Sequence, residues 1–266
     1  MPELPEVQTV VNSLLKLKNK EIINFSYSWD KVIYNVPVKK FKNIIKSQTV
    51  NNITRKGKYI IIHLKDSYLI CHLRMTGYLY ISKNLPQQKN HIRGYFTLNN
   101  KEYLIFQDVR KFGGFYYYSS ISELDIKIGL DPFDKNFTKE WLNKNLKRKK
   151  RMMKHLLLDQ KFICGLGNIY VDEILWKSKI HPKTNSQNIK DFNSLHFNII
   201  STLKESIDFH GTTIINFKFD NMKTGNYKNK LMVYGRNNLP CNRCSKLIIK
   251  RRVAGRGTYI CIYCQK

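Results

Sequence analysis

Residues 59–73 read YIIIHLKDSYLICHL, two short apolar runs separated by the polar residues Lys65-Asp66-Ser67. Runs that are rich in β-branched and aromatic residues and end at polar turn residues are typical of neighbouring strands. Such runs recur at Tyr59–Leu64, Tyr68–Leu73, Gly94–Leu98, Glu102–Phe106 and Gly114–Tyr118. The spacing predicts antiparallel β-structure, a sandwich or a barrel, between Thr49 and Tyr118.

Helical periodicity flanks this segment on both sides. Upstream, Val7–Asn19 carries apolar residues close to the helical period, and Pro5 suits a helix start. Downstream, the character changes near Gly129-Leu130-Asp131-Pro132, which predicts a domain boundary around residues 131–136. Three later segments have helical character: Trp141–Lys161, Tyr170–Ser178 and Leu195–Phe209. The polar stretch Asp220–Lys230 predicts an exposed loop.

Composition limits the classes of function. The 266 residues include 47 Lys+Arg against 19 Asp+Glu, a formal net charge of +28. Such an excess repels itself in a compact fold unless a polyanion binds. An AT-rich genome, which inflates Lys and Asn, is an alternative, but it does not explain the low number of acidic residues. A nucleic-acid partner is therefore favoured.

The sequence also indicates where the chain works. No segment approaches the roughly 20 apolar residues of a transmembrane helix, and the acidic start Met1-Pro2-Glu3-Leu4-Pro5-Glu6 is unlike a signal peptide. We therefore expect a cytoplasmic protein. In that compartment its six cysteines suggest thiol or metal chemistry before disulfides.

The cysteine spacing near the C-terminus predicts a structural zinc site. Two Cys-x2-Cys pairs, formed by Cys241, Cys244, Cys261 and Cys264, are separated by sixteen residues. Four thiolates leave no open coordination position, so a closed structural site is favoured over a catalytic one. The residues between the pairs predict a short hairpin that needs the metal for stability. Cys71 and Cys164 stand alone in apolar surroundings, which predicts buried core thiols.

The amino terminus is a candidate nucleophile. Removal of Met1 would leave Pro2 with a free secondary amine, and an α-amino group has a reference pKa near 7.7–8.0, so part of it is neutral at physiological pH. A neutral amine can attack C1′ of a deoxyribose and form an iminium. Glu3 and Glu6 follow closely, and one carboxylate could move protons at the sugar. By themselves these residues are equally compatible with ordinary helix-start chemistry.

Six separated motifs resemble those of one known family. They are MPELPEV at 1–7, GKY at 57–59, HLRMTG at 72–77, DVRKFG at 108–113, GLGNIY at 165–170 and the four-cysteine finger with Arg256. In this order, from Met1 to Lys266, the sequence is similar to bacterial formamidopyrimidine-DNA glycosylases, also called 8-oxoguanine DNA glycosylases. The resemblance implies an α+β multidomain fold. Its parts would be a catalytic β-sandwich (1–131), a helical helix–two-turn–helix domain that binds DNA (132–236) and a zinc-finger hairpin (237–266).

The resemblance also implies a reaction. Pro2 would displace the damaged base and hold the sugar as a Schiff base, Glu3 would act as general acid/base, and Lys58 would contact phosphate and assist at the sugar. The enzyme would be a bifunctional DNA glycosylase and AP lyase for oxidised purines that cuts the strand by β- and δ-elimination. We expect one structural zinc ion, no nucleotide cofactor, damaged double-stranded DNA as partner, and a monomer.

The remaining implied roles concern DNA contacts. Met75, Arg110 and Phe112 would fill the hole that an extruded base leaves, a task that suits a flexible side chain, a hydrogen-bonding Arg and an aromatic wedge. From the residues alone, core packing is favoured for Met75 and Phe112. Phosphate contacts are expected at His91, Lys154, Asn168 and Arg256, with Asn168 in a Gly-x-Gly-Asn turn that suits an anion site. Lesion contacts are expected at Glu6, Thr224 and Tyr227.

Two other interpretations stay open at the level of sequence. An endonuclease VIII-like enzyme for oxidised pyrimidines shares the N-terminal Pro-Glu, the Lys, the Asn turn and the finger, whereas Leu4, Lys154 and the Met75/Arg110/Phe112 set favour a purine enzyme. A non-catalytic zinc-ribbon nucleic-acid binder fits the composition and the finger, but not Pro2, Glu3 and Lys58 together. The loop at 220–234 lacks the proline of the commoner family pattern, and Val109 and Lys111 replace the usual Pro and Arg.

Overall fold

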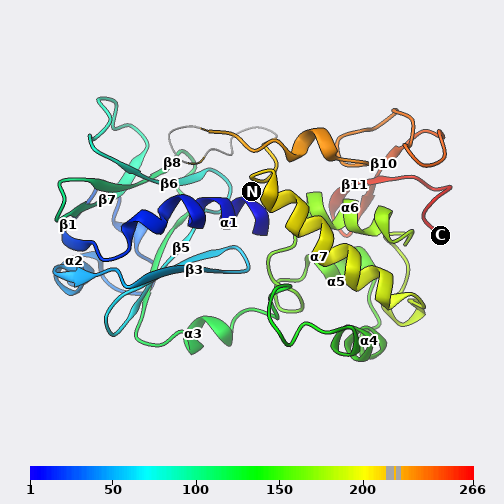
Figure 1. Cartoon of the computed structure of the whole chain (residues 1–266), viewed down its shortest axis with the longest axis horizontal. Coiled ribbons are helices and arrows are strands. Elements are labelled where there is room, and N and C mark those ends of the chain that lie inside the picture. Colours follow the sequence, from blue (N-terminus) through cyan, green and yellow to red (C-terminus); the bar gives the residue numbers. More distant parts are fainter. Residues whose placement is uncertain (214–218, 220–222) are drawn as a thin grey trace. The chain divides into compact units, whose positions relative to one another are not determined.

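The computed structural model describes residues 1–213, 219 and 223–266 (Figure 1). The chain forms two compact units. The first comprises residues 1–126 and 209–226, and the second comprises 127–208 and 227–266. The β-rich segment lies in the first unit, and the main helices and the cysteine-rich C-terminus lie in the second.

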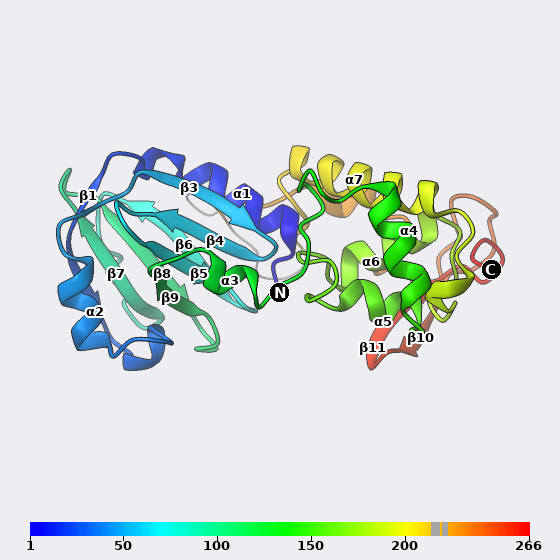
Figure 2. The same ribbon diagram turned by 90° about the horizontal axis from the view of Figure 1, so that it is seen from below.

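Two antiparallel sheets form the first unit (Figure 2). One sheet contains, in spatial order, β2 (Gln48–Thr49), β1 (Glu21–Tyr27), β7 (Ile92–Leu98), β8 (Tyr103–Asp108) and β6 (Gly77–Ser82). The other contains β3 (Asn52–Lys56), β4 (Tyr59–His63), β5 (Tyr68–His72) and β9 (Gly114–Tyr118). Each of the five apolar runs seen in the sequence forms one of these strands, so the predicted sandwich is confirmed.

Aromatic side chains from both sheets fill the space between them. The Phe115 ring of β9 lies 5.4 Å from the Phe96 ring of β7 and 5.2 Å from the Phe106 ring of β8, both edge-on. All three side chains are fully buried, and edge-to-face packing adds to the free energy gained by burying their area. Cys71 of β5 belongs to this core, and Cys164 is buried in the second unit, as predicted.

The helix α1 (Leu4–Leu14) packs against the sandwich through its apolar face. Val7, Val10, Val11 and Leu14 are buried, at the spacing of one helix face. The helix is followed by a 3-10 turn, η1 (Leu15–Leu17), and the chain then reverses at Asn19, whose φ is 65°. Three short pieces complete this unit: η2 (Asp30–Val32), α2 (Val38–Ile45) and α3 (Ser122–Asp125).

The second unit is built on α4 (Lys139–Arg148), α5 (Met153–Leu158), α6 (Asn168–Lys177) and α7 (Phe192–Asp208), with a 3-10 turn, η3 (Ser186–Asn188). The single helical segment predicted over 141–161 is therefore two helices. The break begins within a run of five cations, Lys147–Arg151, whose mutual repulsion opposes continued helix. Lys149 is extended (φ −108°, ψ 126°), and its carbonyl accepts a hydrogen bond from the Ser186 hydroxyl.

The C-terminal segment forms the predicted hairpin. Strands β10 (Ile249–Val253) and β11 (Arg256–Ile260) pair from Ile249↔Ile260 to Val253↔Arg256. The two-residue turn has positive φ at both Ala254 (50°) and Gly255 (73°), the conformation that tight hairpins require.

The exposed loop predicted over 220–230 is only partly borne out. Residues 220–222 lie outside the described residues, and Thr224 is exposed. Residues 227–230, by contrast, form a 3-10 turn, η4 (Tyr227–Lys230), and the Tyr227 side chain is fully buried. In the described residues, no helix combines the length and the apolar character needed to cross a bilayer.

Candidate active site and nucleic-acid interface

The pairing of β4, β5 and β9 places several candidate residues at one end of the four-stranded sheet. Tyr59 at the start of β4 pairs with His72 at the end of β5, and His72 pairs with Gly114 at the start of β9. The turn that holds Lys58, the loop after β5 and the loop before β9 therefore leave the sheet at the same end. Met75 lies in the second of these segments, and Arg110 and Phe112 lie in the third.

The N-terminus of α1 is held by a reciprocal capping box. The Glu3 N–H donates to Glu6 Oε2 at 2.8 Å, and the Glu3 carboxylate accepts from the backbone N–H of Glu6. Glu6 Oε1 also accepts from the Thr212 N–H at 2.6 Å. Pro2, Glu3 and Glu6 are all buried. Glu6 thus fixes both the start of α1 and the backbone at Thr212.

Lys58 lies in the two-residue turn between β3 and β4 and is only 4% exposed. The turn requires Gly57, whose φ is +55°. Arg55 braces it by donating from Nε to Gln8 Oε1 on α1 at 3.0 Å and from Nη1 to the Gly57 carbonyl at 3.1 Å. The structure thus ties the strand that leads to Lys58 to the helix that begins after Pro2 and Glu3.

His72 is a site residue that sequence reasoning missed. It is buried, its ring lies 4.5 Å from the Tyr59 ring, and its Nδ1 accepts the Arg74 N–H at 3.0 Å. Burial, with the nearby charges of Arg74 and Lys58, lowers the pKa of His72 to about 3. The imidazole is therefore neutral, and because Nδ1 accepts, Nε2 carries the proton. The signal in the sequence was its place as the first residue of the HLRMTG motif.

Asp108 is a second missed residue, and it fixes both loops. One carboxylate oxygen accepts from the Thr76 hydroxyl and from the Arg110 N–H (3.1 Å). The other accepts from the N–H groups of Phe112 (2.8 Å) and Gly113 (2.7 Å). Asp108 is 1% exposed, so these four donors supply the hydrogen bonds that water would give to an exposed carboxylate. An Asp that precedes a loop commonly binds the N–H groups that follow it, which was the available signal.

The structure brings Met75, Arg110 and Phe112 together on the surface. Arg110 Nη1 lies 2.9 Å from the Met75 sulfur, and its guanidinium lies 4.7 Å from the centre of the Phe112 ring. Met75 is 45% and Phe112 50% exposed. The core-packing alternative is therefore wrong for both side chains. His91, also exposed, lies at the same end, because its carbonyl accepts the Asp108 N–H at 2.9 Å.

In the second unit, Asn168 and Arg256 lie close together. Asn168 begins α6, and its Nδ2 donates to the carbonyl of Gly257, the neighbour of Arg256 on β11, at 2.9 Å. Arg256 is exposed. Among the described residues, the buried Asn168 Oδ1 has no hydrogen-bond partner. These positions agree with a shared phosphate contact at a helix start.

The position of Lys154 does not agree with the predicted direct contact to a phosphate. Its side chain is 0% exposed, and its ammonium lies 2.5 Å from Asp172 Oδ1. Asp172 Oδ2 accepts the Tyr259 N–H of β11 at 2.9 Å. Burial raises the pKa of Asp172 to about 7, although Lys154 and the Tyr259 N–H oppose the shift. Lys154 on α5 therefore forms a buried ion pair with α6, and the same Asp172 carboxylate binds the hairpin.

Tyr227 also occupies a different place from the one expected of a lesion contact. Its hydroxyl donates to Glu205 Oε2 at 3.1 Å, and its ring lies 6.0 Å from the Tyr170 ring. The aromatic body is enclosed in the second unit, which raises the pKa of its hydroxyl. Of the three expected lesion contacts, Thr224 alone is exposed.

The four cysteines of the finger converge on one point. The sulfurs of Cys241, Cys244, Cys261 and Cys264 all lie within 4.8 Å of one another. The Sγ–Sγ distances are 3.9 Å for Cys241–Cys264 and 3.4 Å for Cys244–Cys261. Tetrahedral zinc with Zn–S bonds of about 2.3 Å needs about 3.8 Å between sulfurs, so the set fits zinc.

The finger is joined to α6 by polar contacts. Trp176 Nε1 donates to Cys241 Sγ at 3.4 Å, and the Arg243 guanidinium lies 4.1 Å from the Trp176 ring centre. The buried Glu173 carboxylate accepts the N–H groups of Met232, Val233 and Tyr234 at 2.8–2.9 Å. Adjacent carboxylates of α6, on Asp172 and Glu173, therefore hold two different parts of the C-terminal segment.

Models of three protein domains match the chain in the order of its structural parts. The formamidopyrimidine-DNA glycosylase N-terminal domain matches residues 1–115, and the formamidopyrimidine-DNA glycosylase H2TH domain matches residues 128–218. The zinc finger found in FPG and IleRS matches residues 238–266. The chain belongs to the formamidopyrimidine-DNA glycosylase family. This family comprises DNA glycosylases of base-excision repair, and its finger identifies the four-cysteine cluster as the site for one structural zinc ion.

Individual members of this family are similar to the chain over nearly its whole length. The formamidopyrimidine-DNA glycosylase of Bacillus licheniformis is 38% identical over 274 residues, with 100% of both chains covered. That of Mycoplasma genitalium is 37% identical over 273 residues, covering 100% of this chain and 96% of the relative. The solved complex of wild-type Lactococcus lactis Fpg with N7-benzyl-Fapy-dG DNA has a TM-score of 0.91 and 34% identity, with 100% of both chains covered. The complex of the same Lactococcus protein with abasic-site DNA also has a TM-score of 0.91 and 34% identity, with 99% of each chain covered.

Proposed function

We propose that this family member is a bifunctional enzyme that excises oxidised purines from duplex DNA and then cleaves the strand, with the Pro2 amine as nucleophile. The observation that carries the proposal is the group of residues at one end of the sandwich. The turn of the buried Lys58, which Arg55 links to the helix that begins after Pro2 and Glu3, lies at the same end as an exposed Met75–Arg110–Phe112 cluster. The first group suits covalent chemistry, and the second suits an opened base stack.

The reaction balances with groups that the chain supplies. Once Met1 is removed, the neutral Pro2 nitrogen attacks C1′ of the damaged nucleotide, and the bond between C1′ and the base nitrogen breaks. The base leaves with its electron pair and takes up a proton, and opening of the sugar gives an iminium between Pro2 and C1′. Glu3, held at the start of α1, is placed to shuttle protons at the sugar.

Strand cleavage then follows from the iminium, which acts as an electron sink. Loss of a C2′ proton expels the 3′ phosphate by β-elimination, and a second elimination expels the 5′ phosphate. The Lys58 ammonium, placed at the hairpin turn, contacts phosphate and stabilises its negative charge. The neutral His72 lies close enough to Lys58 for that charge to lower its pKa, and it is suited to donate a hydrogen bond from Nε2 at the same place.

Binding is proposed to use both units. Met75, Arg110 and Phe112 fill the space of the extruded base, His91 contacts the backbone, and Asn168 and Arg256 hold a phosphate. The zinc ion adds no reaction step, because four thiolates complete its coordination and its effect is to stabilise the hairpin that carries Arg256. Complexes of the Lactococcus protein, 34% identical over 99–100% of the chain, with N7-benzyl-Fapy-dG DNA and with abasic-site DNA support damaged DNA as the partner.

Borohydride trapping tests the proposal. The protein, with Met1 loss and bound zinc checked by mass, is mixed with a duplex that has one 8-oxoguanine opposite cytosine, and borohydride is added to reduce the iminium to a stable adduct. A covalent adduct that falls at least a hundredfold in Pro2→Gly is expected. An adduct formed mainly on a dihydrouracil duplex would instead indicate an oxidised-pyrimidine enzyme with the same chemistry. No adduct on either duplex would refute the proposed catalysis.

A further inference from the structure

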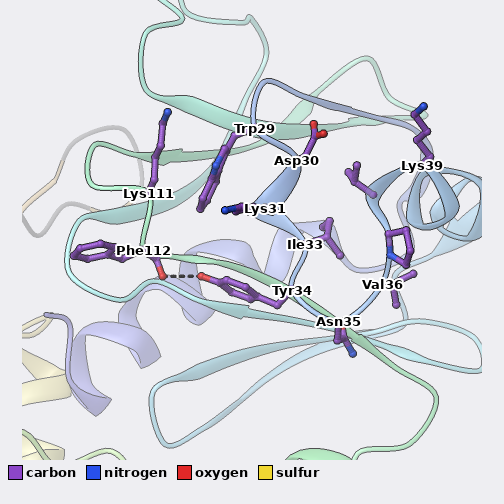
Figure 3. A pocket seen from close by; sticks show the side chains of 12 residues that line it. Trp29, Asp30, Lys31, Ile33, Tyr34, Asn35, Val36, Lys39, Lys111 and Phe112 are labelled. Carbon is purple, nitrogen blue, oxygen red and sulfur yellow. Dashed lines mark hydrogen bonds between the residues drawn. The ribbon is translucent and has the colours of Figure 1, made fainter.

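A groove of about 910 Å³ lies in the first unit, beside the Phe112 loop (Figure 3). One wall is the segment 29–39, which runs from the end of β1 into the first turn of α2, and the other is formed by Lys111 and Phe112 in the loop before β9. None of the roles assigned above uses the segment 29–39. Phe112 is therefore shared between the exposed wedge cluster and a second surface whose occupant is unassigned.

The walls of the groove are fixed against each other. The Tyr34 hydroxyl donates to the Phe112 carbonyl at 2.6 Å, as Figure 3 shows, and the Tyr34 N–H donates to the Phe115 carbonyl at 2.9 Å. The Tyr34 ring also lies 4.7 Å from the Tyr116 ring. A Cβ on Gly114 would lie 2.5 Å from the Val32 carbonyl, so the two segments are in direct backbone contact there. The groove is thus preformed, which lowers the entropic cost of binding.

The lining chemistry matches a nucleotide. Three aromatic rings, on Trp29, Tyr34 and Phe112, are half-buried or exposed and offer faces on which a base can stack. The charged side chains of the lining are Lys31, Lys39 and Lys111 against one acid, Asp30. All three lysines are exposed, and within the described part of the chain none of them forms an ion pair. Aromatic faces beside unneutralised cations fit a stacked base and its phosphate.

We propose that this groove holds a nucleotide of the strand opposite the lesion, next to the orphaned base. The inference rests on the proposed function, in which Phe112 and Arg110 occupy the hole and Arg110 binds the orphaned base. Since Phe112 is at once the wedge and a wall of the groove, the strand that carries the orphaned base continues into the groove. Its phosphates lie near Lys31 and Lys111, and the neighbouring sugar and base pack on Trp29 and Tyr34.

Photocrosslinking with the full-length zinc-loaded protein tests the contact directly. The duplex carries a tetrahydrofuran abasic-site analogue, which cannot form the iminium, and 5-iododeoxyuridine replaces one nucleotide at a time, in either strand. The expected result is a crosslink from one or two adjacent positions of the undamaged strand, mapped by mass spectrometry to Trp29 or Tyr34. Crosslinks to these residues from the lesion strand alone would overturn the proposal.

Affinity measurements provide the matched controls. Trp29→Ala is expected to weaken binding of the same duplex roughly tenfold, the range for loss of one stacked base, whereas Trp29→Phe keeps most of the affinity. Lys31→Ala is expected to lower the slope of log affinity against log salt by about one, because one phosphate contact is lost. The reference is Lys65→Ala, which removes an exposed lysine in the β4–β5 turn, outside the groove. Its affinity shows the effect of losing one positive charge elsewhere on the protein.

The outcomes separate the two hypotheses. If wild-type protein fails to bind the abasic-analogue duplex more tightly than undamaged duplex, the proposed function itself fails. If wild-type protein binds it selectively but Trp29→Ala and Lys31→Ala behave like Lys65→Ala, only the groove assignment is wrong. Trp29 is partly buried against the sandwich core, so the unfolding midpoint of each variant is measured first. Trp29→Ala is then compared with Trp29→Phe, which keeps an aromatic ring, and with Lys31→Ala, whose side chain is exposed.

Discussion

The two units position their candidate DNA-contacting residues by different physical means. In the first unit, the Met75 and Arg110–Phe112 loops leave a large apolar sandwich and are held by neutral N–H and O–H donors that converge on one carboxylate, Asp108. In the second, Arg256 lies on a two-stranded hairpin held by the buried ion pair Lys154–Asp172, by Glu173 and by four thiolates.

The size of the available core explains the difference. The sandwich core contains residues from both sheets and α1, so its loops need only local fixation. Within the described residues, the buried cluster at the finger is small: Trp176, Val233, Cys241, Ile248 and Cys261, with four partly buried side chains packed against it. So few apolar groups cannot offset the entropy of ordering the hairpin, and metal and charge must supply the rest. We therefore expect substitutions in the second unit to lower mainly the stability of the protein. Substitutions in the loops of the first unit are expected to lower mainly its activity.

The largest effect is expected from loss of zinc. Structural zinc binds finger peptides with an apparent free energy of about 10–16 kcal/mol, so Cys244→Ser or a strong chelator should unfold the hairpin. Duplex affinity should fall by a hundredfold or more while the strands of the sandwich keep their amide protection in hydrogen exchange. The control is Cys71→Ala, which removes a buried thiol outside the finger. This variant should still bind zinc. A zinc-free protein with unchanged affinity would contradict the comparison.

Next in size is the buried ion pair. Lys154→Met leaves Asp172 buried without its cation, and breaking such a pair costs about 3–5 kcal/mol. The free energy of unfolding should fall by this amount in denaturant titrations, and Lys154→Met/Asp172→Asn should recover part of it. If Lys154→Met lowered the salt slope of DNA binding without loss of stability, Lys154 would be a phosphate contact after all.

A smaller and more selective effect is expected at Asp108. Asp108→Asn presents an amide N–H to several N–H donors, and each unsatisfied buried group costs about 1–3 kcal/mol. Excision of 8-oxoguanine should slow roughly tenfold to a hundredfold, as in Phe112→Ala, whereas cleavage of a preformed abasic site should change much less. Asp125→Asn, which breaks only a partly exposed pair with Lys56, is the matched control. Equal losses on both substrates would argue against control of the wedge loops by Asp108.

The smallest effect is a pH dependence in the first unit. The pKa of His72 is about 3 in the folded chain against an ordinary value of 6.5 when the chain is unfolded, so the unfolded chain binds a proton first as the pH falls. Stability is therefore full above about pH 6.5 and is lost progressively toward pH 3. Between pH 7 and pH 5 the loss from this group is about 2 kcal/mol. His72→Gln should flatten this part of the profile in urea titrations, and an unchanged slope would place the effect elsewhere.

Much of the fold could be predicted from local pattern. The apolar runs gave the strands, because period and turn residues act over a few positions, and the Cys-x2-Cys spacing gave the zinc site. The helix break after Arg148 was missed although the run of cations at 147–151 is visible in the sequence, because the Ser186 hydroxyl that binds the Lys149 carbonyl is distant in sequence. The burial of Tyr227 was missed because its hydroxyl partner, Glu205, lies on a separate helix. Propensity carries no information about such partners.

The sequence by itself determined the chemical content of this protein: the sandwich strands, the four thiolates, the cationic excess, and the Pro-Glu start and motifs that mark its family. Tertiary structure decided which of these groups reach solvent. It buried Lys154 against Asp172 and exposed Met75 and Phe112, the reverse of what their polarity suggests. The physical reason is that burial depends on charge pairing and on strand register across the fold. Neither can be read from a residue and its neighbours along the chain.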